Sequence, residues 1–351
     1  MVKPDNESVG KMVKKNSRDW RIELIRFIAT ISIAIFHFEW IYLGNPVYFR
    51  HFYIWVEFFF VLSGFFLARN VESNSDKEDE LSSLRYLAHM MKKLYPPYIM
   101  GFLISFFAYC IVNEINNLKS ILLLLWNSKW ELLFLNLAGF DSTAPIINGV
   151  VGYIPALLCA SLLIHYLLTK HHRLTVNIIA PILPIFIYSH IVFKYGNLSQ
   201  WLEYENWYTV GILRGIAGCL VGVAAFEIFS KLKKKNIYIY FGAATIPFIM
   251  GLVIFSNEIS YNDEILYPFI FSILIASIYF TPQININGWT KNKILYLGKI
   301  SYNLYVAHYG ICYLLKVWIP NKRYLYIGIP YLLLCCVVAM LMQKFLELKN
   351  K

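Results

Sequence analysis

The stretch RFIATISIAIFH, residues 26–37, lies inside an apolar run near residues 23–42 that is long enough to cross a bilayer as one helix. It begins with Arg26 and ends with His37. Ionisable side chains are rare in spanning helices because burying them in hydrocarbon is costly, and those that occur usually mark a functional site. The rest of the chain must show whether this pair is such a site.

The composition predicts that the whole chain is a membrane protein. Of its 351 residues, 58% are hydrophobic and 15% are charged, whereas a soluble protein carries roughly a quarter charged residues. We therefore predict an all-α integral membrane protein with about ten transmembrane helices. The ten apolar runs lie near residues 23–42, 52–70, 96–113, 150–169, 175–193, 207–229, 237–255, 264–280, 300–318 and 324–343.

The basic residues predict the orientation of these helices. With ten spans, most of the 32 lysines and arginines fall in the tails and loops on one side, and the positive-inside rule makes that side cytoplasmic. Both termini are then cytoplasmic, and residues 119–138, which polar residues interrupt, are predicted to be interfacial or re-entrant. Because the basic residues form no single patch, the net charge of +11 does not indicate nucleic-acid binding.

Three segments follow from this orientation. Residues 1–22 form a basic cytoplasmic tail, residues 23–346 a transmembrane domain, and residues 347–351 a cytoplasmic end. The tail has no short cleavable apolar region, so the first run is predicted to be retained. The six cysteines all lie in apolar runs without a C-x-x-C pair, so we predict neither disulfides nor a metal site.

Arg26 and His37 are eleven positions apart, which is about 16 Å along a helix and close to three turns. They therefore lie on nearly the same helix face, Arg26 near the cytoplasmic end and His37 in the outer half. Two interpretations stay open. The pair can be a functional site, or Arg26 can extend to the inner interface while His37 bonds to a neighbouring helix.

The second run contains VEFFFVLSGFFLAR, residues 56–69, in which Glu57 is an acid that needs a partner. Glu57 and His37 lie in the outer halves of adjacent antiparallel helices. A carboxylate that orients an imidazole is a common arrangement for a general base. The alternative is that Glu57 pairs with Arg50 at the outer surface.

Two lysines precede the third run, in MMKKLYPPY at residues 90–98. The helix is predicted to start at Pro96 or Pro97, since proline is favoured at the first helical position. Lys92 and Lys93 can contact phosphates on the cytoplasmic side, or they can act only as topology anchors.

Two later runs carry further polar groups. Arg214 can bind an anionic or sugar group from outside, or it can neutralise Glu203 or Glu205. The stretch ISYNLYVAHYG, residues 300–310, adds Tyr302, Tyr305 and His308 to one helix, although a stripe of tyrosines more often serves packing than binding.

Taken together, these motifs resemble the membrane-bound acyltransferase 3 family, which acylates carbohydrates at bacterial surfaces. Arg26 and His37 match its pattern of Arg or Lys, ten residues, then His, and residues 56–64 match V-[DE]-x-F-F-x-x-S-G. Three more motifs follow in order at residues 93–96, 214–222 and 300–308. Two positions depart from the family: Met90 stands where an arginine is common, and Gly152, in NGVVGYIPA, stands where many members have tryptophan.

The resemblance implies an O-acyltransferase in a bacterial plasma membrane that moves an acyl group, most simply acetyl, from cytoplasmic acyl-CoA. It implies no bound cofactor. The implied donor-binding residues are Arg69, Lys92 and Lys93, with Arg26 orienting the thioester. His37 would be the general base or the acyl acceptor, and Glu57 would orient or charge-balance it.

The implied acceptor is a sugar hydroxyl of a surface glycan or a lipid-linked saccharide, reached from the outer side. Its expected binding residues are Arg214, Tyr302, Tyr305 and His308. The alternative function is a transporter or flippase that exports such a saccharide, which ten helices with buried charges would also suit.

Overall fold

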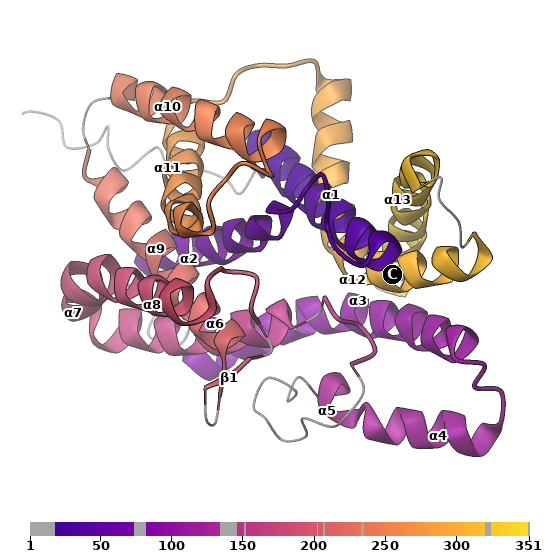
Figure 1. Cartoon of the computed structure of the whole chain (residues 1–351). Coiled ribbons are helices and arrows are strands. Elements are labelled where there is room, and N and C mark those ends of the chain that lie inside the picture. The colour runs from indigo at the N-terminus through magenta and orange to yellow at the C-terminus, as the bar shows by residue number, and fades with distance from the viewer. Residues whose placement is uncertain are drawn as a thin grey trace, which may run out of the picture.

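The computed structural model describes residues 18–73, 82–133, 146–150, 152–201, 203–205, 208–232, 235–319 and 324–349. Most of these residues are helical (Figure 1), so the chain is an all-α protein. Its α-helices are α1 (Trp20–Leu43), α2 (Trp55–Ser73), α3 (Ser83–Val112), α4 (Leu118–Asn127), α5 (Lys129–Leu132), α6 (Tyr153–Lys170), α7 (His172–Leu174), α8 (Ala180–Tyr195), α9 (Val210–Ser230), α10 (Lys235–Ile254), α11 (Leu266–Phe280), α12 (Gly288–Trp318) and α13 (Tyr324–Lys349).

Short elements link several of these helices. Two 3-10 helices, Phe52–Ile54 and Tyr261–Ile265, precede α2 and α11, and a π-helical turn, Thr175–Ile179, joins α7 to α8. The two-residue strands β1 (Tyr204–Glu205) and β2 (Tyr208–Thr209) pair antiparallel just before α9.

Nine helical segments within the described ranges are long and apolar enough to cross a membrane, so the chain is a multi-pass membrane protein. They correspond to nine of the ten predicted runs. The tenth, near residues 300–318, lies in α12, whose polar side chains leave it less apolar. α12 packs against α1, α3 and α13, so those side chains face protein rather than lipid. The count of ten and the cytoplasmic position of both termini stay predictions.

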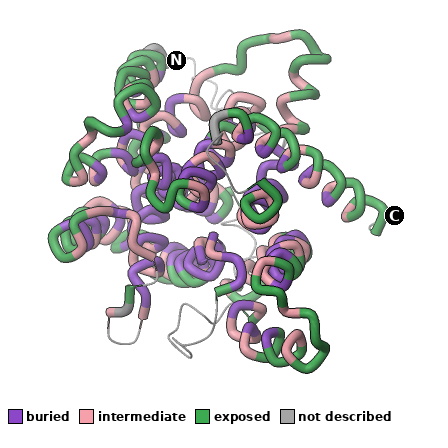
Figure 2. The backbone as a smooth tube through the Cα atoms, turned by 45° about the vertical axis from the view of Figure 1, so that its right-hand side comes forward, coloured by how far each residue is buried: buried purple, intermediate pink, exposed green. Residues whose placement is uncertain are grey.

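The centre of the molecule is the contact between α2 and α9, the two most buried candidate spans, whereas α10 and α13 are the least buried (Figure 2). A Cβ atom added at Gly64 of α2 would lie 1.9 Å from the carbonyl oxygen of Cys219 on α9. One added at Gly222 of α9 would lie 2.1 Å from that of Val61. These glycines therefore let the two backbones touch, as small residues do in membrane helix pairs.

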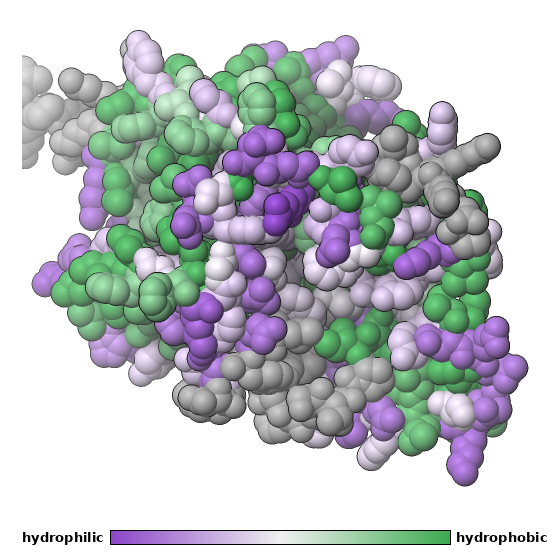
Figure 3. All heavy atoms as spheres, viewed as in Figure 1, coloured by the Kyte–Doolittle hydropathy of each residue, from purple (hydrophilic) through white to green (hydrophobic). Residues whose placement is uncertain are grey.

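Large apolar side chains cover the outer helices. Phe193 on α8, Tyr240 on α10 and Tyr326 on α13 are all strongly exposed, as expected where helices face lipid. Figure 3 shows hydrophobic residues over much of one side and hydrophilic residues gathered near the middle of the face drawn.

The start of α3 corrects a prediction. The helix begins at Ser83 and runs through both Pro96 and Pro97, so the predicted start at a proline is wrong. Each proline removes the N–H that would bond the carbonyl four residues earlier. Those carbonyls belong to Lys92 and Lys93, which are exposed, so water can donate hydrogen bonds to them instead.

The short helix α4 agrees with the prediction that residues 119–138 do not simply span. Ten residues reach only about 15 Å, half of the hydrocarbon thickness. α4 packs Leu124 against Phe102 and Phe106 of α3 and leaves Leu122 and Trp126 exposed. This exposure suits an interfacial helix, while residues 134–138 lie outside the described ranges.

Candidate active site

The residue at the centre of the site is His37, which lies on α1 beside His308 of α12. Nδ1 of His37 is 2.9 Å from the carbonyl oxygen of Ile33 and 3.2 Å from Nε2 of His308. Nδ1 of His308 is 2.7 Å from the carbonyl oxygen of Tyr305. His308 is fully buried and His37 is half-buried. The two predicted site residues therefore form one histidine pair between α1 and α12.

Glu57 lies in a second buried cluster, between α2 and α9. Its carboxylate accepts a hydrogen bond from Nε of Arg214 at 2.7 Å and one from the hydroxyl of Tyr188 on α8 at 2.5 Å. Arg214 also donates from Nη1 to the carbonyl oxygen of Gln200 at 3.1 Å. Its Nη2 is buried and has no hydrogen-bond partner among the described residues. This nitrogen is a donor that a ligand could use.

The Glu57 cluster corrects three expected pairings. Glu57 bonds to Arg214 and Tyr188 instead of orienting His37 or pairing with Arg50. The guanidinium of Arg50 lies over the ring of Tyr261, 4.7 Å from its centroid. Arg214 correspondingly neutralises Glu57. Glu205 is one of the two acids that Arg214 could have neutralised. It pairs with Lys194, Tyr195 and His190 instead.

The N-terminal end of α1 carries Arg26, which lies near one of the predicted donor-binding residues, Lys93. Nη1 of Arg26 donates to both carboxylate oxygens of Glu23, at 3.0 and 3.2 Å, and Glu23 is buried. Lys93 of α3 lies within electrostatic range of Arg26, Arg18 and Glu23. Three cations and one acid therefore lie within electrostatic range of one another, and Arg26 among them is about 16 Å along α1 from His37, as the helical rise requires.

The other two donor-binding candidates lie on α2 and α3. The Arg69 guanidinium is 5.4 Å from the ring centroid of Tyr279 on α11. Lys92 is exposed on α3, next to Lys93 in the chain. Lys93 thus lies within electrostatic range of Arg26, while Arg69 makes its close contact with α11.

The two tyrosines predicted to bind the acceptor use their hydroxyls in packing contacts. Tyr302 donates to the carbonyl oxygen of Leu94 on α3 at 3.0 Å, and Tyr305 donates to that of Val150 at 2.5 Å. The ring of Tyr305 also lies 5.8 Å from that of His308. These contacts connect α12 to its neighbours, and the ring of Tyr305 lies next to the histidine pair.

Glu131 on α5 is a buried acid that the sequence analysis did not single out. It accepts hydrogen bonds from the backbone N–H groups of Ile147 and Asn148, at 2.8 and 2.9 Å. Nδ2 of Asn148 donates to the carbonyl oxygen of Val306 on α12 at 2.8 Å. Glu131 therefore anchors residues 146–150 against the helix that carries His308.

Burial raises the pKa of Glu131 to about 7, against the opposing effect of its two N–H bonds. A carboxyl group whose pKa is raised on folding stabilises the folded state fully below its ordinary pKa and loses that contribution as pH rises through the raised value. We therefore expect the protection of the Ile147 and Asn148 amides against hydrogen exchange, corrected for intrinsic rates, to fall at least about tenfold from pH 5 to pH 8.

The control for this prediction is Glu131→Gln, which cannot ionise. Its amide protection should be lower than that of the wild type at acidic pH and should not change across the same range. Equal wild-type protection at both ends of the range would contradict the assignment of the titration to Glu131.

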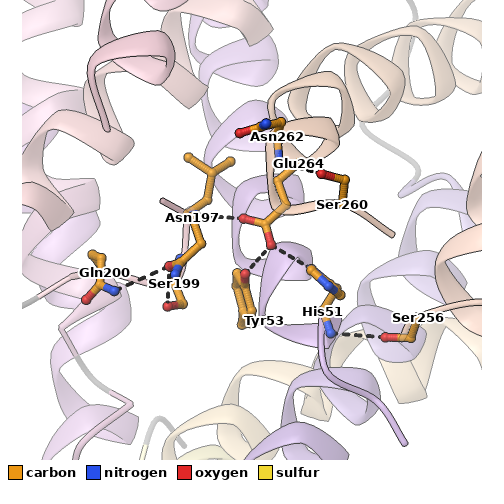
Figure 4. Close-up of polar contacts among 10 residues, drawn as sticks. His51, Tyr53, Asn197, Ser199, Gln200, Ser256, Ser260, Asn262 and Glu264 are labelled. Atoms are coloured by element: carbon orange, nitrogen blue, oxygen red, sulfur yellow. Dashed lines mark hydrogen bonds and ion pairs between the residues drawn. The ribbon is translucent and has the colours of Figure 1, made fainter. Parts of the chain in front are cut away.

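A second unpredicted cluster surrounds Glu264, which is fully buried. Figure 4 shows His51 and Tyr53 directed at its carboxylate, with the segment around Asn197 on the other side. Nδ1 of His51 is 2.6 Å from Oε1, the Tyr53 hydroxyl donates to the same oxygen, and the N–H of Leu198 donates to Oε2 at 2.6 Å. One acid thus ties together three loops that are distant in sequence.

The loop at residues 196–201 connects this cluster to the site. Leu198 bonds to Glu264, and Gln200 accepts from Arg214. The ring of Trp201 packs over Gly152, where an added Cβ would lie 1.9 Å from a ring carbon. The residue that stands where the family often has tryptophan is therefore covered by a tryptophan from this loop.

These groups define a class of protein: a multi-pass membrane protein with cations at one end of a helix and a half-buried imidazole further along it. Such an imidazole can act as a base or nucleophile. In the described ranges, no three His, Cys, Asp or Glu side chains come together to hold a metal ion.

A family model described as an acyltransferase domain matches residues 19–344, nearly the whole chain. The chain belongs to the membrane-bound acyltransferase 3 family, and it is a membrane acyltransferase. The predicted resemblance and enzyme class are thereby confirmed. Neither the curated protein sequences nor the solved structures include a significant match to the chain.

Proposed function

We propose that the chain transfers an acyl group, most simply acetyl, from cytoplasmic acyl-CoA to a sugar hydroxyl of a surface glycan or lipid-linked saccharide. The proposed location is a bacterial plasma membrane. The observation that carries the proposal is the arrangement of α1, which bears Arg26 within a basic cluster at one end and the half-buried His37 about 16 Å further along.

The donor end of the path is the basic cluster. Acyl-CoA is rich in phosphates, and lysine and arginine bind phosphates by charge-assisted hydrogen bonds. In this proposal Lys93 and Lys92 bind these phosphates, with Arg69 as a further contact from α2. Arg26 is part of the same cluster and lies on the helix that leads to His37, so it would orient the thioester.

In this proposal His37 is the general base or the nucleophile of the chemical step. The sugar hydroxyl oxygen forms a bond to the thioester carbonyl carbon, the C–S bond breaks, and the hydroxyl proton passes to His37 and then to the departing thiolate. In the alternative route a ring nitrogen of His37 attacks the thioester carbonyl carbon, the C–S bond breaks and the thiolate leaves. The sugar hydroxyl oxygen then bonds to the acyl carbon and displaces the imidazole, and the hydroxyl proton passes to the thiolate. Both routes balance and both use the same ring nitrogen.

The acceptor end is proposed to include Arg214. Glu57, Tyr188 and Gln200 fix its guanidinium, and its buried Nη2 remains a free donor among the described groups. A sugar hydroxyl or ring oxygen would satisfy that nitrogen. In this proposal Glu57 acts on Arg214, and the rings of Tyr302 and Tyr305 shape the space next to His308.

The test compares cells carrying the wild-type chain, His37→Gln or no chain. Ester-linked acetate is released from the surface glycan by mild alkali and divided by the amount of glycan. His190→Gln is the matched control, because His190 is an exposed histidine paired with Glu205. We expect acetate per glycan to be lost in His37→Gln and retained in His190→Gln. Unchanged acetate with reduced exported glycan would instead support the transporter alternative.

A further inference from the structure

We propose that His308 is a positioning residue that holds His37 in the tautomer with its proton on Nδ1, so that Nε2 is the atom that takes the proton or the acyl group. The inference about the reacting atom rests on the proposed function. The inference about the tautomer rests on the contacts of the pair alone.

The first step is the protonation of His308. Its Nδ1 lies 2.7 Å from the carbonyl oxygen of Tyr305, and a carbonyl oxygen can only accept a hydrogen bond. Nδ1 must therefore carry a proton. A neutral imidazole has one N–H, so Nε2 of His308 holds a lone pair.

The second step applies the same reasoning to His37. Its Nδ1 faces two acceptors, the carbonyl oxygen of Ile33 at 2.9 Å and the lone pair of His308 Nε2 at 3.2 Å. Both contacts require a proton on Nδ1 of His37. Ile33 lies one turn back on α1, whereas His308 is contributed by α12, so only the second contact depends on the packing of these two helices.

The third step follows for the remaining nitrogen. With the proton on Nδ1, Nε2 of His37 holds the lone pair, and no hydrogen bond from the described residues engages it. The His37 side chain is half-buried, unlike that of His308. Nε2 is therefore the accessible nucleophilic atom of the pair.

The pair also explains how His37 can work without a carboxylate. When Nε2 bonds to a proton or an acyl carbon, positive charge spreads to Nδ1–H, and the lone pair of His308 lies opposite it. The titratable side chains that contact the pair are tyrosines: Tyr305 and Tyr309 through their rings, and Tyr331, whose hydroxyl donates to the His308 carbonyl oxygen. Glu57, the expected partner, is committed to Arg214.

The test of the tautomer uses the full-length chain with ¹⁵N-labelled histidine in lipid bilayers at mildly alkaline pH. The ¹⁵N shifts of an imidazole distinguish a protonated Nδ1 from a protonated Nε2, and His37→Gln and His308→Gln identify the two rings by loss of their signals. We expect both rings to be protonated on Nδ1. A His37 ring protonated on Nε2 would overturn the inference, whether or not the chain transfers acyl groups.

The test of positioning measures acyl transfer by His308→Leu and His308→Gln. Leu fills the space without an acceptor, whereas Gln offers a carbonyl oxygen near the former Nε2. We expect kcat of the Leu variant to fall about 10- to 100-fold, the range for removing the partner that orients a functional histidine. KM for acyl-CoA should stay unchanged, and the Gln variant should recover part of the rate. Equal losses in both folded variants would overturn the positioning role, whereas an inactive wild-type chain would contradict the proposed function instead.

Discussion

Replacing His37 by glutamine is expected to lower the rate of acyl transfer by about 10²- to 10⁴-fold, the usual contribution of a general base. The side chain is half-buried, and its hydrogen-bonding contacts among the described residues are to Ile33 and His308, so the fold should be retained. Glutamine keeps polarity at this position but has neither a basic nitrogen nor a nucleophilic one. The measurement is the initial rate with labelled acetyl-CoA in proteoliposomes.

The control for the His37 prediction is His190→Gln, which changes an exposed histidine on α8. Its rate should equal that of the wild type. If His37→Gln is folded and retains most of the rate, the reacting group is elsewhere. The proposal that α1 leads from the basic cluster to the reacting group would then be contradicted.

Replacing Glu57 by alanine is expected to destabilise the folded protein by about 3–5 kcal/mol, the cost of leaving one member of a buried ion pair alone. Glu57 is fully buried and Arg214 nearly so, and both lie at the contact between α2 and α9. The uncompensated guanidinium would therefore remain in the centre of the molecule. The measurement is thermal unfolding in detergent, monitored by the amount of protein that stays monodisperse.

Two comparisons make the Glu57 prediction specific. The double variant Glu57→Leu with Arg214→Met removes both charges and should recover most of the stability, since apolar replacements of buried pairs are often tolerated. Glu347→Gln breaks the exposed contact with Lys299 and should change stability by no more than about 1 kcal/mol. A single variant as stable as Glu347→Gln would contradict the structural role of the pair.

The helices could be predicted from the sequence because each span is a local property of about twenty apolar residues. The same holds for Arg26 and His37, which share one helix, so their spacing alone places them along its axis. The run near residues 300–318, which lies in α12, is predicted in the same way, although its polar residues make it a weaker span. Its burial between other helices is what stabilises those residues in the membrane.

The pairings between helices could not be predicted in the same way. Glu57 and Arg214 are 157 positions apart, and nothing in the local pattern of either residue chooses one partner over another. The meeting of His37 with His308 depends likewise on the packing of α1 against α12. Glu131 and Glu264 were missed because an acid in a short helix beside an apolar run resembles a solvated residue until other segments of the chain pack over it.

The central claim is that His37 passes an acyl group from acyl-CoA to a saccharide. It is tested most directly with purified wild-type chain and His37→Gln in sealed proteoliposomes, supplied with labelled acetyl-CoA and a lipid-linked saccharide. The account predicts that the wild type places alkali-labile label on the saccharide and that His37→Gln does not. A wild-type chain that moves the saccharide across the bilayer without labelling it would contradict the account.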